Sequence, residues 1–372
     1  MQDLTSRLRE LTKEPSRDTA ADPKRLERVE KTRVEMAVQG KAILNTLASQ
    51  AEALENSFRD IESRKIDRIV IAGCGDSWFA GAGVRFAIEL MTGVTVDAVQ
   101  ALDFAAYGAT ACTSRTLVIG ISSGGNTPAV MQALNAASQK GAFTVGISNT
   151  VGSPILTQFD AAFVVQADRK GWPTQSTNAT MALLIALGAE IGKGRAVAAT
   201  VMSELRALAG SLDDLCESLE PEVTALAEKW SSAGLVLYTG LGPNFAAAAI
   251  GAAKLRELSP SHAFAFPLEE YHHYRTQKAG DPLVLVATDP ESQDRALDTA
   301  LVAEEVGGPV FAILADDNPE LESRVETVIK LPKVHPALNA MVSIIPLHLL
   351  AYHFAKSRSA RGLGAPSLSS VA

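Results

Sequence analysis

The sequence contains an internal duplication, and this feature limits the fold more than any other. A segment beginning at Arg68 (RIVIAGCGDSWF) matches one beginning at Leu235 (LVLYTGLGPNFA), and both glycines recur 167 residues further along. Two later apolar segments, which begin at Thr116 and Thr144, have counterparts at a spacing of 166 residues. Repetition at a near-constant spacing indicates that one structural unit occurs twice in the chain.

Each repeated unit alternates short apolar segments with Ala-rich segments of helical composition. An apolar run without polar alternation is typical of a strand in a parallel sheet that is covered on both faces. Strands joined by helices imply right-handed crossovers. The sequence therefore predicts an α/β fold with two tandem, doubly wound parallel sheets of the flavodoxin-like kind. In the first unit we expect strands at 68–73, 94–99, 117–122, 143–148 and 161–166, and helices at 77–91, 128–140 and 177–192.

The predicted elements divide the chain into four parts. We expect a helical segment at 1–60, a first α/β domain at 61–194, a charged helical connector at 195–232, and a second α/β domain with a C-terminal tail at 233–372. Ligands of open parallel sheets bind beyond the carboxyl ends of the strands. The functional residues are therefore expected in the loops that follow the strands.

The charge balance excludes several kinds of partner. The 372 residues include 34 Lys and Arg against 42 Asp and Glu, which gives a formal net charge of −8. A negative surface is not attracted to phosphate backbones or anionic lipids, so we expect neither nucleic acid nor a membrane as partner. The apolar stretch at 341–354 also falls short of the roughly 18 residues that a membrane span needs.

The cysteines and the N-terminus indicate a compartment. Cys74, Cys112 and Cys216 are scattered and form no C-x-x-C pair, which is typical of neither a disulfide framework nor a zinc site. The first residues carry frequent charges and lack the apolar core of a signal peptide. We therefore expect a soluble, cytoplasmic protein without a bound metal.

The segment SSGGNTP at 122–128 is the best candidate for an anion site. It follows an apolar strand and opens a helix, with Thr127 as N-cap and Pro128 at the first helical position. Its glycines let backbone amides converge, and a helix N-terminus carries partial positive charge, so the turn suits a phosphate. The hydroxyls of Ser122 and Ser123 add donors. An ordinary polar turn between a strand and a helix has the same composition, and the turn alone does not decide between the two.

Two Gly-x-Gly turns, at 73–75 and 240–242, follow the first strand of each unit. A dinucleotide-binding turn needs a small third residue, where Trp78 and Phe245 stand instead. A nicotinamide-dependent enzyme is therefore the weakest hypothesis, although Asp97 lies where a ribose-binding acid would be. We expect no cofactor, and favour turns that let a sugar ring approach the backbone.

Lys254 and Glu257 lie three residues apart near the end of an Ala-rich helix and so share a face. Glu257 opposes the helix dipole there, a local violation of the kind expected at functional positions. Burial would raise its pKa and suit it to accept a proton. A salt bridge on a solvated helix end explains the pair equally well. Ser176, ahead of another apolar helix, is open to the same choice between helix capping and ligand contact.

The segment EEYHHY at 269–274 gathers two acids, two histidines and two tyrosines. Adjacent side chains point in different directions, which is poor geometry for a metal site. His273 is a candidate general acid or base near neutral pH.

Together these segments resemble a known family. From about residue 30 to the C-terminus, the sequence is similar to two SIS (sugar isomerase) modules in tandem, as in the isomerase half of glutamine–fructose-6-phosphate aminotransferase. The resemblance rests on CGDS at 74–77, SSGGNT at 122–127, KLRE at 254–257, E-x-x-H at 270–273 and PLHLLAYH at 346–353.

The resemblance implies a site for a small-molecule sugar phosphate. The serine-rich turn would hold the phosphate, Glu257 would move a proton between C1 and C2, and His273 would open the sugar ring from across a dimer interface. A homodimer is thus implied. We expect the substrate contacts to come from Ser77, Ser122, Ser123, Gly124, Thr127, Ser176 and Lys254.

The sequence also departs from the family. The glutamine-hydrolysing domain has no counterpart in it, so we do not expect a complete glutamine-dependent aminotransferase. The C-terminal lysine that forms a Schiff base with the sugar is not found either, and Ser370 lies near its place. A second family lysine is Asn178 here, and the residue after His273 is Tyr274 rather than glycine.

These observations lead to a functional expectation and a rival. The leading hypothesis is an enzyme acting on a phosphorylated ketosamine or aminosugar, either a fructosamine-6-phosphate deglycase or an aminosugar-phosphate deaminase/isomerase. The rival is a non-catalytic sensor of sugar phosphates, because SIS modules also serve as ligand-binding parts of regulators. The presence of both Glu257 and His273 favours the enzyme.

Overall fold

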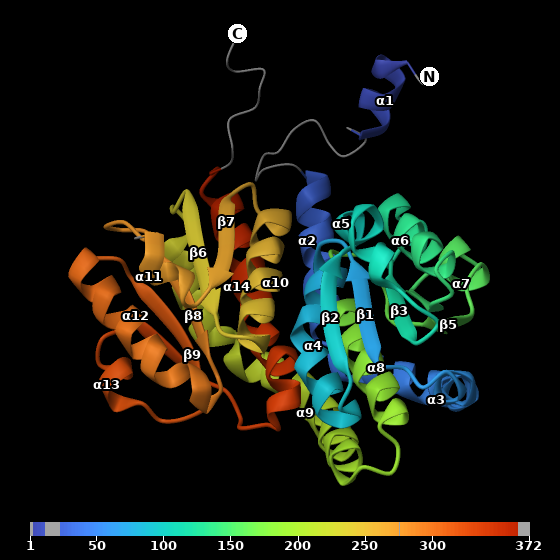
Figure 1. The fold of residues 1–372 in the computed structure, drawn as a ribbon. Coiled ribbons are helices and arrows are strands. Elements are labelled where there is room, and N and C mark those ends of the chain that lie inside the picture. Colours follow the sequence, from blue (N-terminus) through green and yellow to red (C-terminus); the bar gives the residue numbers. More distant parts are fainter. Residues whose placement is uncertain (1–2, 12–22, 275, 364–372) are drawn as a thin grey trace.

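The computed structural model describes residues 3–11, 23–274 and 276–363, and each half of it holds a five-stranded parallel sheet between helices (Figure 1). The strand order is β2-β1-β3-β4-β5 in the first sheet and β7-β6-β8-β9-β10 in the second, so both sheets have one topology. The predicted pair of doubly wound parallel sheets is confirmed. The strands are β1 Arg68–Gly73, β2 Thr95–Gln100, β3 Thr116–Ile121, β4 Phe143–Ser148, β5 Ala161–Val164, β6 Leu235–Gly240, β7 His262–Pro267, β8 Leu283–Ala287, β9 Val310–Leu314 and β10 Thr327–Lys330.

The duplication extends to the register of the strands. Arg68 pairs with Thr95 in the first sheet, and Leu235 pairs with His262 in the second, so both partners move by 167 residues. The turns after β1 and β6 are also alike, because a Cβ on Gly73 or Gly240 would lie 2.6 Å from backbone atoms of the following helix. Only glycine allows strand and helix to approach this closely.

The helices predicted for the first half are present, with ends within two residues of expectation. The short elements α5, η1 and α7 were not predicted. The helices are α1 Leu4–Leu11, α2 Pro23–Met36, α3 Gln39–Ser63, α4 Asp76–Thr92, α5 Ala101–Ala106, α6 Pro128–Ser138, α7 Pro154–Thr157, α8 Gln175–Ile191, α9 Ala196–Trp230, α10 Pro243–Leu258, α11 Glu270–Tyr274, α12 Gln293–Val306, α13 Pro319–Glu322 and α14 Asn339–Ala360, with 3-10 turns η1 Gly108–Ala111, η2 Pro290–Ser292 and η3 Pro336–Leu338.

The apolar strands are explained by the two layers that cover each sheet. In β1, Ile69 and Ile71 face the layer of α3, α4 and α8, whereas Val70 and Ala72 face the layer of α5 and α6. Successive residues of a strand point to opposite faces, so a sheet buried on both sides needs apolar residues at every position.

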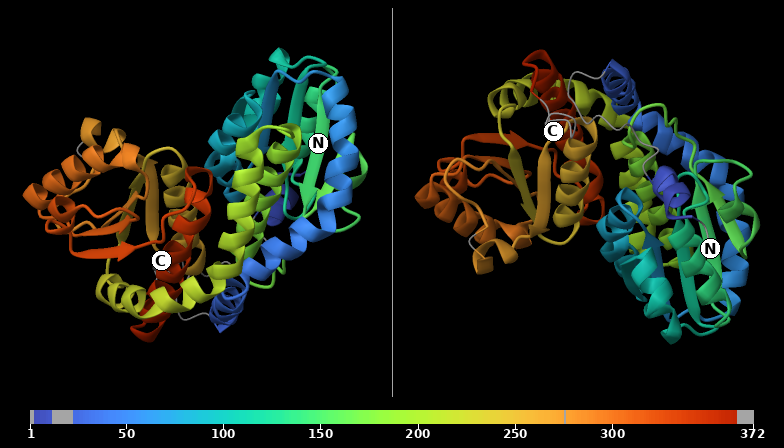
Figure 2. Two further views of the ribbon diagram at one scale, coloured as in Figure 1. Left: turned by 90° about the horizontal axis from the view of Figure 1, so that it is seen from below. Right: turned by 90° about the horizontal axis from the view of Figure 1, so that it is seen from above.

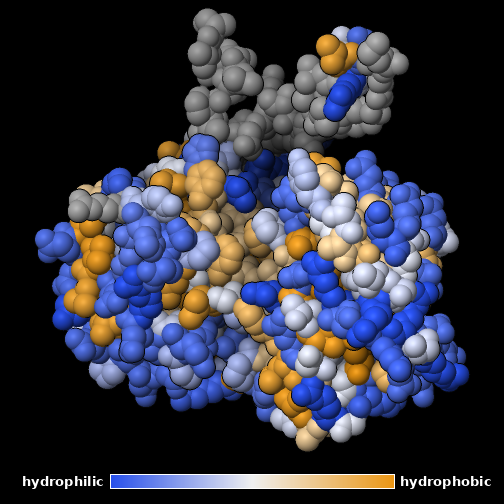
Figure 3. All heavy atoms as spheres, in the orientation of Figure 1, coloured by the Kyte–Doolittle hydropathy of each residue, from blue (hydrophilic) through white to orange (hydrophobic). Residues whose placement is uncertain are grey.

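The two halves share one central core. The cluster that covers the inner face of the first sheet continues through α4, α8, α9, α10 and α14 to the inner face of the second. Figure 2 shows both lobes from two sides, with α9 passing between them. On the face that Figure 3 shows, most of the outer surface is polar or charged, and apolar residues lie along the boundary between the halves and in smaller patches on each lobe.

Within the residues that the structure describes, one helix is long and apolar enough to cross a membrane, so the expectation that this stretch is too short was wrong. It covers Pro336–Ala360, and 94% of its apolar window is buried inside the fold. Such burial is typical of the core helix of a soluble protein. The cytoplasmic location stays a prediction.

Candidate active site

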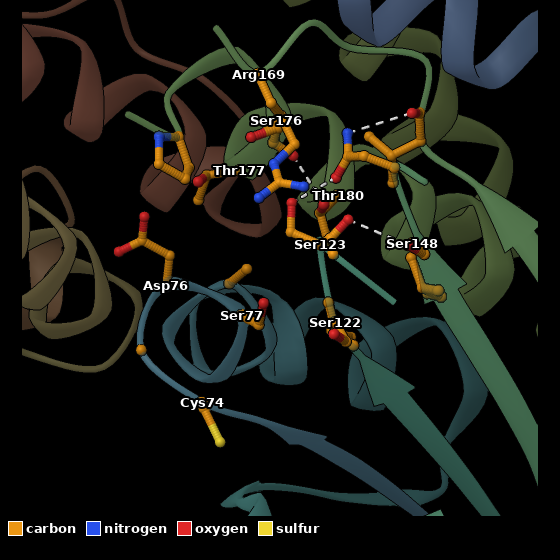
Figure 4. Close-up of a pocket in the computed structure, with 18 of the residues that line it drawn as sticks. Cys74, Asp76, Ser77, Ser122, Ser123, Ser148, Arg169, Ser176, Thr177 and Thr180 are labelled. Carbon is orange, nitrogen blue, oxygen red and sulfur yellow. Dashed lines mark hydrogen bonds between the residues drawn. The ribbon is translucent and has the colours of Figure 1, made fainter. Parts of the chain in front are cut away.

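A cavity of about 290 Å³ lies at the carboxyl end of the first sheet, where the switch in strand order leaves the loops of β1 and β3 apart. Four loops of the first half and one side chain of the second, Glu257 on α10, form its wall. Figure 4 shows the polar side chains that converge on it. Of the predicted site residues, those that line it are Ser77, Ser122, Ser123, Gly124, Thr127, Ser176 and Glu257.

The β3–α6 turn holds its hydroxyls in an ordered chain. The buried Ser122 Oγ accepts hydrogen bonds from the backbone N–H of Gly125 at 3.0 Å and of Thr127 at 3.3 Å. Its third contact is Thr127 Oγ1 at 2.7 Å. Since both lone pairs of Ser122 are engaged, its own hydrogen points to Thr127, and the Thr127 hydroxyl is left to donate to a ligand. Thr127 is the N-cap residue as predicted, but its side chain does not cap the helix.

The remaining hydroxyls divide into fixed and free groups. Ser123 Oγ donates to Asn149 Oδ1 at 2.8 Å, so Ser123 is oriented from β4. Within the described ranges, the side-chain hydroxyls of Ser77 and Ser176 have no hydrogen-bond partner, and both residues line the cavity. These two hydroxyls are therefore available to a sugar.

Arg169 is a site residue that our sequence reasoning missed. It lies in the loop after β5, and Figure 4 shows its guanidinium pointing into the cavity toward Ser123 and Thr180. Within the part of the chain that the structure describes, Arg169 makes no ion pair. A guanidinium without a counter-ion above a serine-rich turn fits a phosphate. Its position after the last strand of the sheet, among loops already expected to bind the ligand, was the available signal.

The loop that carries Arg169 is held by helix α2. Glu35 Oε1 accepts from the backbone N–H of Lys170 at 2.6 Å and of Gly171 at 3.1 Å, and Thr32 Oγ1 accepts from that of Trp172 at 2.9 Å. A Cβ on Gly171 would lie 2.5 Å from the Thr32 backbone, so the loop packs directly on the helix. The N-terminal helical segment thus positions the cation of the site.

On the opposite wall, one lysine joins two acids. Lys254 is fully buried, and its Nζ lies 2.5 Å from Asp76 Oδ2 and in contact with Glu257 Oε2. The sequence predicted the pair of Lys254 and Glu257 but not Asp76. Lys254 itself does not line the cavity; it lies behind the two carboxylates. Its role in the structure is to position them, and substrate contact by Lys254 stays a prediction.

The surroundings of Glu257 raise its pKa. About 39% of its side chain is open to the cavity, but protein encloses the remainder, and this desolvation is the largest cause that raises its pKa. Repulsion from Asp76 raises the pKa further, whereas attraction to Lys254 lowers it. A glutamate with a raised pKa exchanges protons closer to neutral pH.

His273 does not line the cavity of a single chain. It belongs to α11 beside the edge strand β7, where its Nε2 lies 3.4 Å from Glu269 Oε1 and 61% of its side chain is exposed. The neighbouring His272 points the other way, to Thr299 Oγ1 at 3.0 Å. A role for His273 in the site requires a second subunit, and stays a prediction.

Other residues singled out in the sequence have structural partners. Asn178 is buried, and its amide nitrogen donates to Gln39 Oε1 at 3.1 Å and to the Met341 carbonyl at 3.3 Å, so it ties α8 to α3 and α14. Asp97 pairs with Arg68 at 2.8 Å. Ser370 lies outside the described residues.

The second half carries a more apolar counterpart of this cavity, of about 400 Å³, whose lining includes Gly242, Asp289 and, from α4, Phe86. Thr288 Oγ1 donates to Asn244 Oδ1 at 2.7 Å, and the Asn244 amide donates to Asp289. Buried carboxylate and amide groups that satisfy one another leave no donors for an anion. The positions that match Ser77, Ser122 and Ser123 by the repeat spacing are Asn244, Thr288 and Asp289, all of them buried.

Two tandem α/β units of one topology define the class of protein. SIS domain matches cover residues 63–189 and 230–358, and the chain belongs to the SIS domain family.

Similarity to other proteins agrees with this assignment. The chain is 28% identical over 323 residues (84% of this chain) to the glutamine–fructose-6-phosphate aminotransferase (isomerizing) of Thermus thermophilus, and 32% identical over 302 residues (79%) to that of Chlorobaculum tepidum. It spans about half the length of these relatives, 53% and 49%. In fold it matches the C-terminal domain of glucosamine-fructose-6-phosphate aminotransferase from Francisella tularensis, with a TM-score of 0.70 at 22% identity over 85% of this chain and 96% of that one.

Proposed function

We propose that the protein is an enzyme that processes a phosphorylated ketosamine or aminosugar, as a fructosamine-6-phosphate deglycase or an aminosugar-phosphate deaminase/isomerase. One observation carries the proposal: Glu257, on a helix of the second half, lines the same cavity as the serine-rich turn of the first half. A sugar phosphate in this cavity would meet the turn with its phosphate and Glu257 with its reacting carbons.

The phosphate would occupy the β3–α6 turn. Thr127, Gly124 and Arg169 all line this part of the cavity, and the Thr127 hydroxyl, the Gly124 backbone N–H and the Arg169 guanidinium would donate to the phosphate. Hydrogen bonds from these groups to a phosphate would be charge-assisted, because the acceptor is an anion, and such bonds are roughly twice as strong as neutral ones. Binding energy from this remote group would orient the sugar's reacting carbons.

Glu257 would then move the proton. Taking the C1 proton of a ketosamine gives an enaminol, and returning that proton to C2 gives an imine of the aldose phosphate. Water hydrolyses the imine to an aldose phosphate and a free amine. The same transfer between C1 and C2 of an enediol, without hydrolysis, interconverts an aldose and a ketose. A pKa raised by burial suits Glu257 to both halves of the transfer.

His273 would complete the site from a second subunit. Its side chain is exposed at the sheet edge beside β7, and two aromatic side chains of the same segment, Phe264 and Tyr274, are 52% and 76% exposed. Exposed aromatic residues are enriched at protein interfaces. A homodimer that covers this edge would bring His273 toward a partner's cavity.

Glu257→Gln tests the proposal against the sensor. Purified protein is incubated with fructosamine-6-phosphates, glucosamine 6-phosphate and plain hexose phosphates, and released ammonia, amine and sugar phosphate are quantified separately. We expect turnover of one amine-bearing substrate and a loss of about 10²–10⁴-fold in the variant, with sugar-phosphate binding retained.

The sensor gives a different outcome. Unchanged ligand binding without turnover in either protein would contradict the enzyme and favour the sensor. Glutamine has nearly the same size as glutamate, so we expect the variant to keep the folded structure of the wild-type protein. A difference in turnover then reports the loss of the carboxylate.

A further inference from the structure

Asp76 is the charged residue of the cavity lining that has no role in the proposed mechanism. It begins helix α4, directly after the Gly-x-Gly turn, and lines the cavity on the side away from Ser122 and Ser123 (Figure 4). Its Oδ2 is buried and lies 2.5 Å from Lys254 Nζ. Its Oδ1 has no hydrogen-bond partner within residues 3–11, 23–274 and 276–363, and the side chain keeps 15% of its surface exposed.

The two acids of this wall share one lysine. Lys254 is a single buried ammonium, and both Asp76 and Glu257 contact it. The charge of Arg28 also acts on Glu257, so Asp76 is the acid that depends on its share of Lys254 in a partly desolvated place. Within the described residues, the other cation of the cavity is Arg169, which belongs to the loop of the phosphate end.

We infer that Asp76 is the specificity residue that recognises a positively charged amine on the bound sugar phosphate. The amine would donate to the free Oδ1 of Asp76 and add a positive charge beside that carboxylate. A hydroxyl in the same place could donate one hydrogen bond but would add no positive charge. Lys254 holds Asp76 in place through its other oxygen. This inference rests on the proposed function, because it needs a sugar phosphate in the cavity.

A simpler role exists for an acid at this position. Asp76 lies in the first turn of α4, where a carboxylate stabilises the helix dipole. That role, and the positioning of Lys254, would affect every ligand alike. Discrimination between an amine and a hydroxyl is therefore the measurement that separates the two.

The test compares the affinities of glucosamine 6-phosphate and glucose 6-phosphate by calorimetry, because the two differ only by an amine in place of a hydroxyl. We expect the wild-type protein to bind the aminosugar roughly tenfold tighter. Asp76→Asn should remove most of this preference and leave the affinity for glucose 6-phosphate within a few-fold. Asp76→Ser serves as a second variant if the first does not fold. Asp97→Asn, which removes an acid paired with Arg68 outside the cavity, is the control and should keep the preference.

The outcomes are distinct. Equal affinities in the wild-type protein, or a preference that survives in both Asp76 variants, overturn the inference and leave the proposed function standing. No binding of either sugar phosphate to the wild-type protein removes the phosphate site, and both proposals fail together.

Discussion

At the scale of single residues, the site is a small set of charges whose neighbours set their chemistry. Glu257 alone would be an ordinary helix-end glutamate. Enclosure by the cavity wall and repulsion from Asp76 raise its pKa, and the buried Lys254 lowers it. These opposing effects can be separated by substitution.

Lys254→Met should shift the acid limb of the pH profile upward. A general base is active only when deprotonated, so activity is lost as the pH falls through its pKa. The raised pKa of Glu257 places this limb above the ordinary glutamate value of 4.5, and removal of the attracting lysine raises it further. The measurement is kcat/KM against pH.

The surface offers a matched control for this variant. Lys193 and Glu190 form an exposed pair with the same spacing of three residues, and Lys193→Met should leave the profile unchanged. A profile that does not move in Lys254→Met would show that Glu257 is not the titrating base.

Arg169→Gln should weaken sugar-phosphate binding by roughly tenfold or more, because a charge-assisted contact to the phosphate is lost. Titration calorimetry with a hexose phosphate measures the effect. Lys170→Gln removes the same charge from the same loop, and its side chain is exposed and pairs with Asp168. Equal losses in the two variants would indicate general electrostatic attraction rather than a direct contact.

At the scale of elements, the site depends on how a helix from outside the sheet holds a loop. The loop after β5 has little secondary structure, and its backbone N–H groups are bound by Glu35 and Thr32 of α2. Arg28 also lies over the ring of Trp172, with its guanidinium carbon 4.3 Å from the ring centroid. The position of Arg169 is therefore decided by contacts that do not involve the cavity.

Gly171→Ala should weaken sugar-phosphate binding without changing any residue that lines the cavity. The added Cβ would lie 2.5 Å from backbone atoms of Thr32, so the loop must move away from α2 and carry Arg169 with it. Gly210→Ala in α9, where an added Cβ meets open space, is the control and should be neutral or stabilising by up to about 1 kcal/mol. Unchanged affinity in Gly171→Ala would mean that the loop adapts without moving Arg169.

At the scale of the whole molecule, duplication produced two similar sheets and one polar cavity wall. The first half keeps hydroxyls that face the cavity, whereas the second half buries its equivalent groups in the cluster of Asn244, Thr288 and Asp289. The second half contributes Glu257 instead, through the shared core that fixes α10 against α4. The proposed chemistry therefore belongs to the pair of halves and to neither alone.

Mixing two inactive variants tests the proposed dimer. If each site combines Glu257 of one subunit with His273 of the other, Glu257→Gln and His273→Gln subunits that are refolded together should regain about a quarter of the wild-type activity, because half of the dimers would then hold one intact site. Each variant refolded alone is the control. Failure to regain activity, with dimers present by light scattering, would remove His273 from the shared site.

The repeat spacing, the apolar strands and the turn chemistry of 122–128 were sufficient to predict two parallel sheets and the place of a ligand. These features are local, because strand periodicity and glycine-rich turns follow from residues close in sequence. The same local reasoning found Glu257 but could not choose between a functional acid and a surface salt bridge. Asp76, which shares Lys254 with Glu257, lies 181 residues before Glu257, and no local sequence pattern relates these two acids.

Tertiary structure alone decided which of the candidate groups meet. Packing of α10 against α4 buries Lys254 between Asp76 and Glu257. Docking of the β5–α8 loop on α2 directs Arg169 toward Ser123. In the second half, Asn244 and Asp289 are hydrogen-bonded to each other instead. Burial, charge pairing and pKa depend on atoms brought together from distant segments, and composition does not specify those distances. The sequence by itself determined the two sheets and their loops, while the contact between the halves determined the site.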